Sequence, residues 1–571
     1  MPLLTIQNLS IDFISEQQVT HAVKNISLEV NRGEILALVG ESGSGKSVTS
    51  LSILRLLPQP PAIYSTGKIL FNEGNKTTDI LLTNAKTIRE FRGSKIAMIF
   101  QEPMSSLNPV MSCGKQVMEA LLTHKKFSIA EAKKQTIGWF DKVKLPEPKI
   151  IFDRYPHQLS GGQKQRVMIA MAMCCEPSLL ICDEPTTALD VTVQKTILQL
   201  IKALQQERNM GVIFITHDLG VVAEIADQVA IMYKGEIVEL DRAEKIFSTP
   251  QHPYTKALIA CRPAAHPKGE RLPVISDFLD NIKAGTEASN TPSTIGFTEL
   301  SNAQLPISTP PVLVDVQNLI VRFPGRTNLF GKTLNSFTAV DEVSFRIFKG
   351  ETLGLVGESG CGKTTLGRTM LRLIDSSSGK IIYNNTDITK LEGKDVKNLR
   401  KNVQLVFQDP YSSLNPRLTI GDAIAEPMKL SGMVHTEKDR KKKVASLLDR
   451  VNLSAGMMNR YPHEFSGGQR QRIVIARALA LEPSLLVCDE SVSALDVSIQ
   501  AQVLNLLNEL KKDLALTMLF ISHDLSVVHY MCDRIMVMRK GKIIETGPAD
   551  EIYYRPQNEY TKKLINAIPK I

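Results

Sequence analysis

The sequence contains one set of motifs twice, in the same order and at a nearly constant spacing. Each half holds a glycine-rich loop, then Ser-Gly-Gly-Gln, then Cys-Asp-Glu, and then a His-Asp pair. From the second motif onward the copies lie 306 residues apart, as in Ser160 and Ser466, Asp183 and Asp489, and His217 and His523. A fixed offset across several motifs indicates a duplicated domain. The chain should therefore fold as two similar domains of roughly 250 residues, each large enough for its own core.

The stretch between the halves differs in composition from both of them. Residues 261–311 contain seven prolines and the polar tract 286–294. Such a stretch cannot bury enough apolar surface to fold alone, so we predict a Pro/Ser/Thr-rich linker here. The first domain is then expected over residues 1–260 and the second over residues 312–571.

Short, fully apolar runs predict a parallel β-sheet in each half, because a strand covered on both faces has no polar side. The runs are 35–39, 179–182 and 212–215 in the first half, and 353–356, 485–488 and 518–521 in the second. Helical patterns lie between them, for example over 193–206 and 499–512. Alternating patterns with Lys-Gly turns at 234–235 and 540–541 predict antiparallel strands. With a helix-rich segment over about 105–155, each half should be an α/β domain with a mainly parallel core, an antiparallel flap and a helical subdomain.

The pattern Gly-x4-Gly-Lys-Ser/Thr follows an apolar run and precedes a helical stretch in both halves. This is the context of a phosphate-binding loop, in which backbone N–H groups surround the phosphate oxygens. Lys46 and Lys363 would contact the β- and γ-phosphates, while Ser47 and Thr364 would give a hydroxyl to Mg²⁺. The predicted loop residues are Gly40, Glu41, Ser42, Gly43, Ser44, Gly45, Lys46 and Ser47, and then Gly357, Glu358, Ser359, Gly360, Cys361, Gly362, Lys363 and Thr364.

Two acidic residues end an apolar run in each half. Asp183 and Asp489 stand where a carboxylate beside the phosphate loop can hold Mg²⁺. The next residues, Glu184 and Glu490, can orient or deprotonate the attacking water. His217 and His523 also end apolar runs, and their recurrence favours contact with the γ-phosphate over a purely structural role.

The Ser-Gly-Gly-Gln motif begins a helical pattern in both halves. A serine hydroxyl, backbone N–H groups and a helix N-terminus predict a second anion site that contains no lysine. A glycine cap is the structural alternative, but it explains neither the serine nor the glutamine. The motif residues are Ser160, Gly161, Gly162 and Gln163, and then Ser466, Gly467, Gly468 and Gln469.

Over nearly the whole chain except the linker, these motifs resemble those of an ATP-binding cassette (ABC) protein with two fused nucleotide-binding domains. The resemblance implies two tandem P-loop NTPase domains, in which the signature motif of one domain completes the ATP site of the other. Site one would combine Lys46, Ser47, Asp183, Glu184 and His217 with Ser466 to Gln469. Site two would combine Lys363, Thr364, Asp489, Glu490 and His523 with Ser160 to Gln163. Because both sets are complete, both sites are expected to hydrolyse ATP.

The same resemblance implies roles for further residues. Gln101 and Gln408 match the Q-loop glutamine, and they would join Ser47, Asp183, Thr364 and Asp489 around Mg²⁺. Asp190 and Asp496 match the D-loop aspartate, and Phe13 and Phe323 are candidates for stacking on adenine. Two of the motif positions at which the halves differ concern the acids and the phosphate loop. At one of them the second half has Ser491 where the first has Pro185, which leaves the acidic residues of the motif intact. The other is Cys361 in place of Ser44, and it predicts that a thiol reagent would block site two and that ATP would protect it.

Two more repeats narrow the class. Residues 101–109 parallel 408–416, and 250–259 are echoed by 556–565 within tails at about 233–260 and 540–571. These repeats resemble the ATPases of bacterial dipeptide, oligopeptide and nickel importers. The resemblance implies a peripheral ATPase on the cytoplasmic face of the inner membrane, with two permease subunits and an extracytoplasmic substrate-binding protein as partners. ATP and Mg²⁺ are the expected cofactors. Cys261 stands alone where some relatives have a cysteine cluster, so no iron–sulfur cluster is predicted.

Composition limits the alternatives. A net charge of +9 spread over 571 residues, without a Lys/Arg stripe, gives no sign of nucleic-acid binding. Eight cysteines without a Cys-x-x-Cys pair indicate a reducing compartment. Neither a signal peptide nor a run of about 18 apolar residues, the length that a membrane-spanning helix needs, is recognisable. The rival interpretation is a soluble twin-cassette ATPase that acts on ribosomes or nucleic acid. The linker is poor in Lys and Arg, and zinc-binding cysteines are absent, so both observations disfavour this rival. The import-type tails disfavour a third interpretation, the ATPase of an exporter. Peptide, glutathione, nickel and antibiotic-peptide cargoes all remain open.

Overall fold

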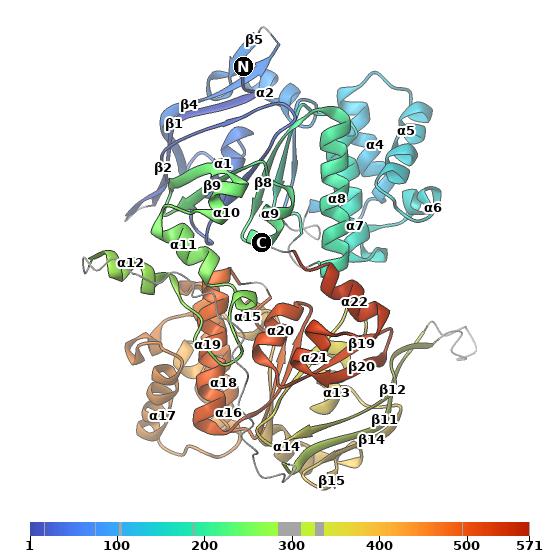
Figure 1. Ribbon diagram of the computed structural model, residues 1–571, viewed down its shortest axis with the longest axis vertical. Helices are drawn as coiled ribbons and strands as arrows, with labels where there is room; N and C mark the ends of the chain where they lie inside the picture. Colours follow the sequence, from blue (N-terminus) through green and yellow to red (C-terminus); the bar gives the residue numbers. More distant parts are fainter. Residues whose placement is uncertain are drawn as a thin grey trace. The chain divides into compact units, whose positions relative to one another are not determined.

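The computed structural model describes residues 1–15, 18–74, 76–101, 106–186, 189–283, 310–325, 336–493 and 495–569. The chain divides into two compact units, one formed by residues 1–259 with Pro569 and the other by residues 260–568. Each unit contains a six-stranded sheet, a four-stranded sheet and a group of helices (Figure 1). The predicted α/β fold of two tandem domains is confirmed.

The six-stranded sheet of the first unit has the order β10-β9-β3-β8-β7-β6. Its strands are β3 (Ile35–Val39), β6 (Ile96–Ile99), β7 (Leu179–Asp183), β8 (Gly211–Thr216), β9 (Gln228–Tyr233) and β10 (Glu236–Arg242). All neighbours pair in parallel except β9 and β10. Every residue of β3, β7 and β8 is buried, which explains their uninterrupted apolar sequences. The predicted turn at Lys234 and Gly235, both with positive φ, joins β9 to β10 in this sheet rather than in the flap.

The flap of the first unit is antiparallel, with the order β2-β1-β4-β5. Its strands are β1 (Leu4–Ser15), β2 (Gln18–Val30), β4 (Ala62–Glu73) and β5 (Lys76–Asp79). The flap shares one apolar core with the central sheet and with α1 (Lys46–Ile53), and Leu4, Leu38 and Ile53 are all buried in it. This packing holds α1, which begins where the phosphate loop ends, against the central sheet.

The helices of the first unit form the other half of its core. They include α4 (Cys113–His124), α5 (Ile129–Lys142), α6 (Pro148–Asp153), α7 (Gly161–Met173), α8 (Val191–Arg208) and α9 (Leu219–Ile225), and also α2 (Ala85–Phe91), η1 (Ile80–Leu82), η2 (Pro156–Gln158), α10 (Ala243–Ser248) and α11 (Pro253–Ala260). Trp139 of α5 and Met168 of α7 share one buried cluster with Phe214 of β8. The helix-rich segment predicted from the sequence is therefore continuous with the face of the sheet opposite the flap.

The second unit repeats this plan, with sheet orders β16-β17-β18-β13-β19-β20 and β12-β11-β14-β15. Its strands are β11 (Val312–Pro324), β12 (Ser336–Phe348), β13 (Thr352–Val356), β14 (Ser378–Tyr383), β15 (Thr386–Asp387), β16 (Val403–Val406), β17 (Leu485–Asp489), β18 (Thr517–Ser522), β19 (Arg534–Arg539) and β20 (Lys542–Pro548). Its helices are α13 (Lys363–Met370), α14 (Gly393–Asn402), α15 (Pro410–Ser413), α16 (Ile420–Leu430), α17 (Glu437–Arg450), α18 (Gly467–Leu479), α19 (Val497–Leu514), α20 (Leu525–Met531), α21 (Ala549–Tyr554) and α22 (Glu559–Asn566), with η4 (Ile388–Lys390), η5 (Ala455–Asn459) and η6 (Pro462–Glu464).

The stretch predicted as a linker contains ordered structure in its first part. Residues 260–283 belong to the second compact unit and include η3 (Pro263–Ala265) and α12 (Ile275–Lys283). Cys261 and Leu272 are fully buried and Val274 is 6% exposed, so the few apolar residues between the prolines do find a core. The polar tract 286–294 lies outside the described residues. Among the described helices, none is long and apolar enough to cross a membrane.

Candidate active sites

The glycine-rich loops connect the central strand of each sheet to the helix that follows it. Residues 40–47 run from β3 into α1, and residues 357–364 run from β13 into α13. Lys46 Nζ donates hydrogen bonds of 2.8 Å to the carbonyls of Gly40 and Glu41. Lys363 Nζ does the same to Gly357 and Glu358, at 2.7 and 3.0 Å. Both ammonium groups therefore lie within the curve of their own loops, where a phosphate can replace these carbonyls as their partner.

The hydroxyl that ends each loop contacts the predicted magnesium-binding aspartate. Ser47 Oγ donates to Asp183 at 3.2 Å, and Thr364 Oγ1 donates to Asp489 at 3.0 Å. Burial raises the pKa of Asp183 to about 6, because the bond from Ser47 and the charge of Lys46 offset only part of the desolvation. The pKa of Asp489 is raised for the same reason. A paired hydroxyl and a poorly compensated carboxylate are hard oxygen donors, and they fit Mg²⁺.

The second acid of each motif is contacted by two side chains, each of which follows a different strand of the sheet. In the first unit, Gln101 Nε2 donates to Glu184 at 3.0 Å, and His217 Nδ1 lies 3.4 Å from the same carboxylate. Glu184 has φ 47°, which turns its side chain away from the course of β7. Its backbone N–H donates to the carbonyl of Ile215, which holds the turn in place. The structure thus brings the predicted Q-loop, acid and histidine residues together.

The second unit has the same arrangement around Glu490. Gln408 Nε2 donates to Glu490 at 2.9 Å, and His523 Nδ1 lies 3.4 Å away. Lys363 Nζ is 3.7 Å from its other oxygen. Burial acts to raise the pKa of Glu490, but His523 and Lys363 outweigh this effect and the pKa is lowered. A carboxylate that stays ionised at neutral pH can accept a proton from water.

The Ser-Gly-Gly-Gln motifs form the N-termini of α7 and α18. Ser160 Oγ accepts the N–H of Gln163 at 3.4 Å, and Gln163 Oε1 accepts the N–H of Ser160 at 3.1 Å. Ser466 and Gln469 form the same reciprocal pair. This capping box is a structural reason for both the serine and the glutamine, so the expectation that a helix cap explains neither residue is wrong. In the described part of each unit these side chains bond to each other and not to the phosphate loop of that unit.

The glycines of this motif are required by packing. A Cβ on Gly162 would lie 2.7 Å from Val193 on α8, and a Cβ on Gly468 would lie 2.2 Å from Ile499 on α19. The D-loop aspartates precede these same helices. Asp190 caps α8 by accepting the N–H of Val193 at 2.9 Å, and Asp496 occupies the corresponding position before α19. Each signature helix is therefore packed against the helix that begins at a D-loop aspartate.

The candidate adenine-stacking residues lie near the far ends of β1 and β11. Phe13 pairs with Thr20 of β2. Two residues further along β2, the carbonyl oxygen of Ala22 approaches the phosphate loop so closely that a Cβ added to Gly45 would lie 2.6 Å from it. Phe323 pairs with Phe337 of β12, and Ala339 approaches Gly362 in the same way. Phe337 is 64% exposed and Phe323 is 39% exposed. Phe337 is thus a further candidate in the second unit, although no sequence motif marks it.

Two tyrosines of the predicted tails also contact the phosphate loops. The hydroxyl of Tyr254 on α11 accepts the N–H of Glu41 at 3.1 Å, and that of Tyr560 on α22 accepts the N–H of Glu358 at 3.2 Å. Burial raises the pKa of Tyr560, so its hydroxyl stays neutral. The repeated Tyr-Thr-Lys of the tails was the only sequence signal for this contact. These tyrosines hold the second residue of each loop.

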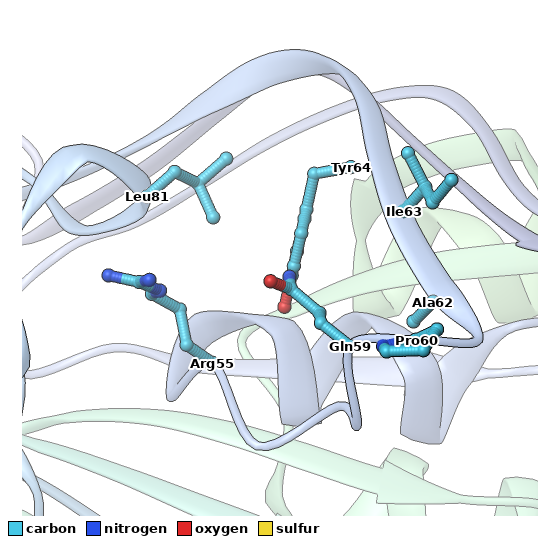
Figure 2. Close-up of a pocket in the computed structure, with 7 residues that line it drawn as sticks. All are labelled: Arg55, Gln59, Pro60, Ala62, Ile63, Tyr64 and Leu81. Carbon is cyan, nitrogen blue, oxygen red and sulfur yellow. The ribbon is translucent and has the colours of Figure 1, made fainter.

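A pocket of about 420 Å³ lies in the first unit between the end of α1 and β4 (Figure 2). It is lined by Arg55, Gln59, Pro60, Ala62, Ile63, Tyr64 and Leu81. Within the described residues the buried hydroxyl of Tyr64 has no hydrogen-bond partner, and burial raises its pKa to about 12. None of the lining residues belongs to the nucleotide motifs. The second unit is five residues shorter between the matching arginine and Gly-Lys pair, because Gly67 follows Arg55 by 12 positions whereas Gly379 follows Arg372 by 7. There Arg372 pairs with Asp375 at 3.3 Å.

Comparison with known families agrees with this geometry. The family model described as ABC transporter matches residues 23–187 and 340–493, which is more than half of the chain. A second model, described as the C-terminal region of oligopeptide/dipeptide transporters, matches residues 238–285 and 544–571. The chain therefore belongs to the ABC transporter family, and we refer to its two units as the first and second cassettes. The resemblance to peptide-importer ATPases is confirmed.

Curated relatives match almost the full length of the chain. The glutathione import ATP-binding protein GsiA of Escherichia coli (strain K12) is 50% identical over 573 residues, covering 99% of this chain and 89% of the relative. The GsiA protein of Pectobacterium atrosepticum is 48% identical over 569 residues with the same coverage. A solved dimeric ATP-binding cassette bound to ADP and phosphate aligns with TM-score 0.38 and 25% identity, covering 41% of this chain and 98% of that one.

Proposed function

We propose that this chain is the ATP-hydrolysing subunit of a bacterial importer for glutathione or a related short peptide. The observation that carries the proposal is the acid–glutamine–histidine cluster beside each phosphate loop, because it supplies a general base where the γ-phosphate would lie. The match to the oligopeptide-transporter region and the names of the relatives support the cargo class. A twin-cassette ATPase acting on ribosomes or nucleic acid has no comparable support.

In each cassette the chain's own residues would divide the chemistry of hydrolysis. The loop N–H groups and Lys46 or Lys363 bind the phosphates, and Ser47 with Asp183, or Thr364 with Asp489, would hold Mg²⁺. Bound Mg²⁺ would neutralise charge on the β- and γ-phosphates. Glu184 and Glu490 accept the proton of the attacking water. His217 and His523 orient these carboxylates and contact the γ-phosphate.

The lysine-free signature motifs are proposed to complete the sites in trans. Ser160 and Ser466 are exposed at helix N-termini, where N–H groups and the helix dipole favour an anion. The capping box explains why the helix begins here, and it leaves this end of the helix accessible to a phosphate. Site one would then use Ser466 to Gln469, and site two would use Ser160 to Gln163.

Two permease subunits and an extracytoplasmic binding protein are the proposed partners, with the chain at the cytoplasmic face of the inner membrane. Aromatic residues next to the Q-loop glutamines support a docking role for that region. Phe100 is 40% exposed, Phe407 is 39% exposed and Tyr411 is 64% exposed. A permease that contacts these residues would act on Glu184 and Glu490 through Gln101 and Gln408.

Affinity purification in a mild detergent, followed by mass spectrometry, tests this proposal. We expect permease subunits and a binding protein to co-purify, and we expect their reconstitution with this chain to give ATP-dependent uptake of labelled glutathione. Recovery of ribosomes in place of permeases would refute import. Uptake of another short peptide without uptake of glutathione would retain the importer and reject the named cargo.

A further inference from the structure

Residues 261–275, named here the arm, are held on the surface of the second cassette. The arm follows α11 directly and includes η3. It belongs to the compact unit of the second cassette, and three of its apolar residues, Cys261, Leu272 and Val274, are buried. The family match over residues 238–285 spans both α11 and the arm. The arm therefore connects a helix of the first cassette to a binding surface on the second.

The centre of that surface is Asn505 on α19. Its side-chain amide donates to the carbonyl of Leu272 and accepts the N–H of the same residue, both at 2.8 Å. This two-point contact pairs both backbone groups of a residue that is fully buried. Asn505 is itself only 8% exposed, so a loss of the contact would leave two backbone groups and one amide buried without partners.

Two further contacts hold the arm on either side of Gly269. The hydroxyl of Tyr530 on α20 donates to the carbonyl of Glu270 at 2.5 Å. Lys268 forms an ion pair with Asp533. The carboxylate of Asp533 also accepts a hydrogen bond of 2.8 Å from the ammonium group of Lys511. Burial acts to raise the pKa of Asp533, but these two lysines outweigh it and the pKa is lowered. Asn505, Tyr530 and Asp533 together form what we call the seat of the arm.

The equivalent surface of the first cassette has different side chains. Gln199 and Glu224 stand at the positions of Asn505 and Tyr530, and Gln205 stands at that of Lys511. Asp227 accepts the N–H of Ile35 at 2.8 Å, just as Asp533 accepts that of Thr352, so the backbone framework is shared. A cavity of about 280 Å³ lies beside Asp227. The seat therefore depends on side chains of the second cassette and not on the fold alone.

We propose that the arm is a non-covalent fastener, which binds the chain of the first cassette to the second cassette independently of residues 284–309. Both flanks of this segment, α12 before it and β11 after it, belong to the second unit. A cut between these two elements therefore leaves the arm on the fragment that contains the first cassette, while its binding surface stays on the other fragment. In the seat, Asn505 lies on α19, Tyr530 lies on α20 and Asp533 follows α20. Because α19 begins directly after Asp496 and α20 begins two residues after His523, the fastener acts on the helices that follow the predicted D-loop aspartate and the predicted catalytic histidine.

Cleavage of the full-length chain tests the proposal. A protease recognition sequence would replace residues 286–294, and the cut protein would be analysed by native mass spectrometry and sedimentation without nucleotide. We expect the two fragments of the cut wild-type chain to remain one particle. A seat variant with Asn505→Leu and Tyr530→Phe should raise the dissociation constant of the fragments about 10- to 100-fold, because three hydrogen bonds to the arm are lost.

Matched variants separate the fastener from general damage. Gln199→Leu with Glu224→Gln changes the equivalent surface of the first cassette and should leave the fragments associated. Lys268→Glu changes only the arm, so it should weaken association while the melting temperature of the second cassette is retained. Separation of the cut wild-type fragments would overturn the proposal. So would seat and arm variants whose fragments associate as tightly as those of the wild type.

Discussion

The side-chain amide of Gln408 donates a hydrogen bond of 2.9 Å to the carboxylate of Glu490. Gln101 and Glu184 repeat this relationship at 3.0 Å in the first cassette. Each glutamine follows an edge strand, β16 or β6, and has an exposed phenylalanine directly before it. The bond therefore links a surface region to the carboxylate that would accept the proton of water, and it gives a physical route by which a docked partner could control hydrolysis.

Neutralising both carboxylates should stop turnover without preventing binding. In Glu184→Gln with Glu490→Gln the amides keep the size of the side chain but cannot accept the proton of the attacking water. We expect steady-state ATP hydrolysis to fall about 10²- to 10⁴-fold. Fluorescent-nucleotide titration should show that ATP affinity is retained, because the lysines and loop N–H groups are unchanged. Near-normal hydrolysis in the double variant would refute the assigned role.

Removal of a tail hydroxyl should weaken nucleotide binding. Tyr560→Phe deletes the acceptor for the N–H of Glu358 and keeps the aromatic ring in place. Since such a bond contributes about 1 kcal/mol, we expect KM for ATP at site two to rise about fivefold with little change in kcat. Tyr554→Phe, at a tyrosine that is 68% exposed, is the control and should have no effect. An unchanged KM in Tyr560→Phe would show that the tail does not support the loop.

The strands and the positions of the repeated motifs could be predicted from the sequence because both depend on local patterns. The run 35–39 coincides with β3, since every side chain in that strand is buried. The bond from Glu41 to Tyr254 could not be predicted, because a backbone N–H and a hydroxyl 213 positions apart leave no local pattern. The burial of the arm could not be predicted for a different reason. The composition of residues 261–311 as a whole is that of a linker, although single residues such as Leu272 decide whether a segment is buried.

The buried carboxyl of Asp183 should make the metal-free first cassette less stable at higher pH. Its pKa is raised to about 6, so its contribution to stability is complete below about pH 4 and is lost as the pH rises through 6. Asp183→Asn removes this ionisation and should raise the melting temperature at pH 8 more than at pH 5. For a pKa shift of this size, the free energy of unfolding can change with pH by at most on the order of 3 kcal/mol.

The same variant should bind Mg·ATP more weakly, because an amide is a poorer ligand for Mg²⁺ than a carboxylate. Differential scanning calorimetry at the two pH values measures the effect on stability. Asp153→Asn, at an exposed position, serves as the control for a change of charge. If Asp183→Asn kept the pH dependence of the wild type, another group would be responsible for it.

The thiol of Cys361 should react slowly, and its modification should inactivate site two. Cys361 is only 6% exposed, and burial raises the pKa of its thiol. The reactive thiolate is therefore scarce at neutral pH, and the rate of labelling should increase with pH. A bound ATP would cover the loop and slow the reaction further. Peptide mapping after treatment with N-ethylmaleimide, with ATPase assays in parallel, measures both effects.

Cys361→Ser places in the second loop the residue that the first loop has at Ser44. This variant should keep ATPase activity, and its second loop should resist the reagent, so that any remaining inactivation reports on other cysteines. Glu490 and His523 are unchanged in it, and a loss of activity would therefore assign to the sulfur a role in shaping the loop. The predicted inactivation would be contradicted by full labelling of Cys361 with unchanged ATPase activity. That result would show that the loop tolerates the added group and that site two does not depend on the space around this thiol.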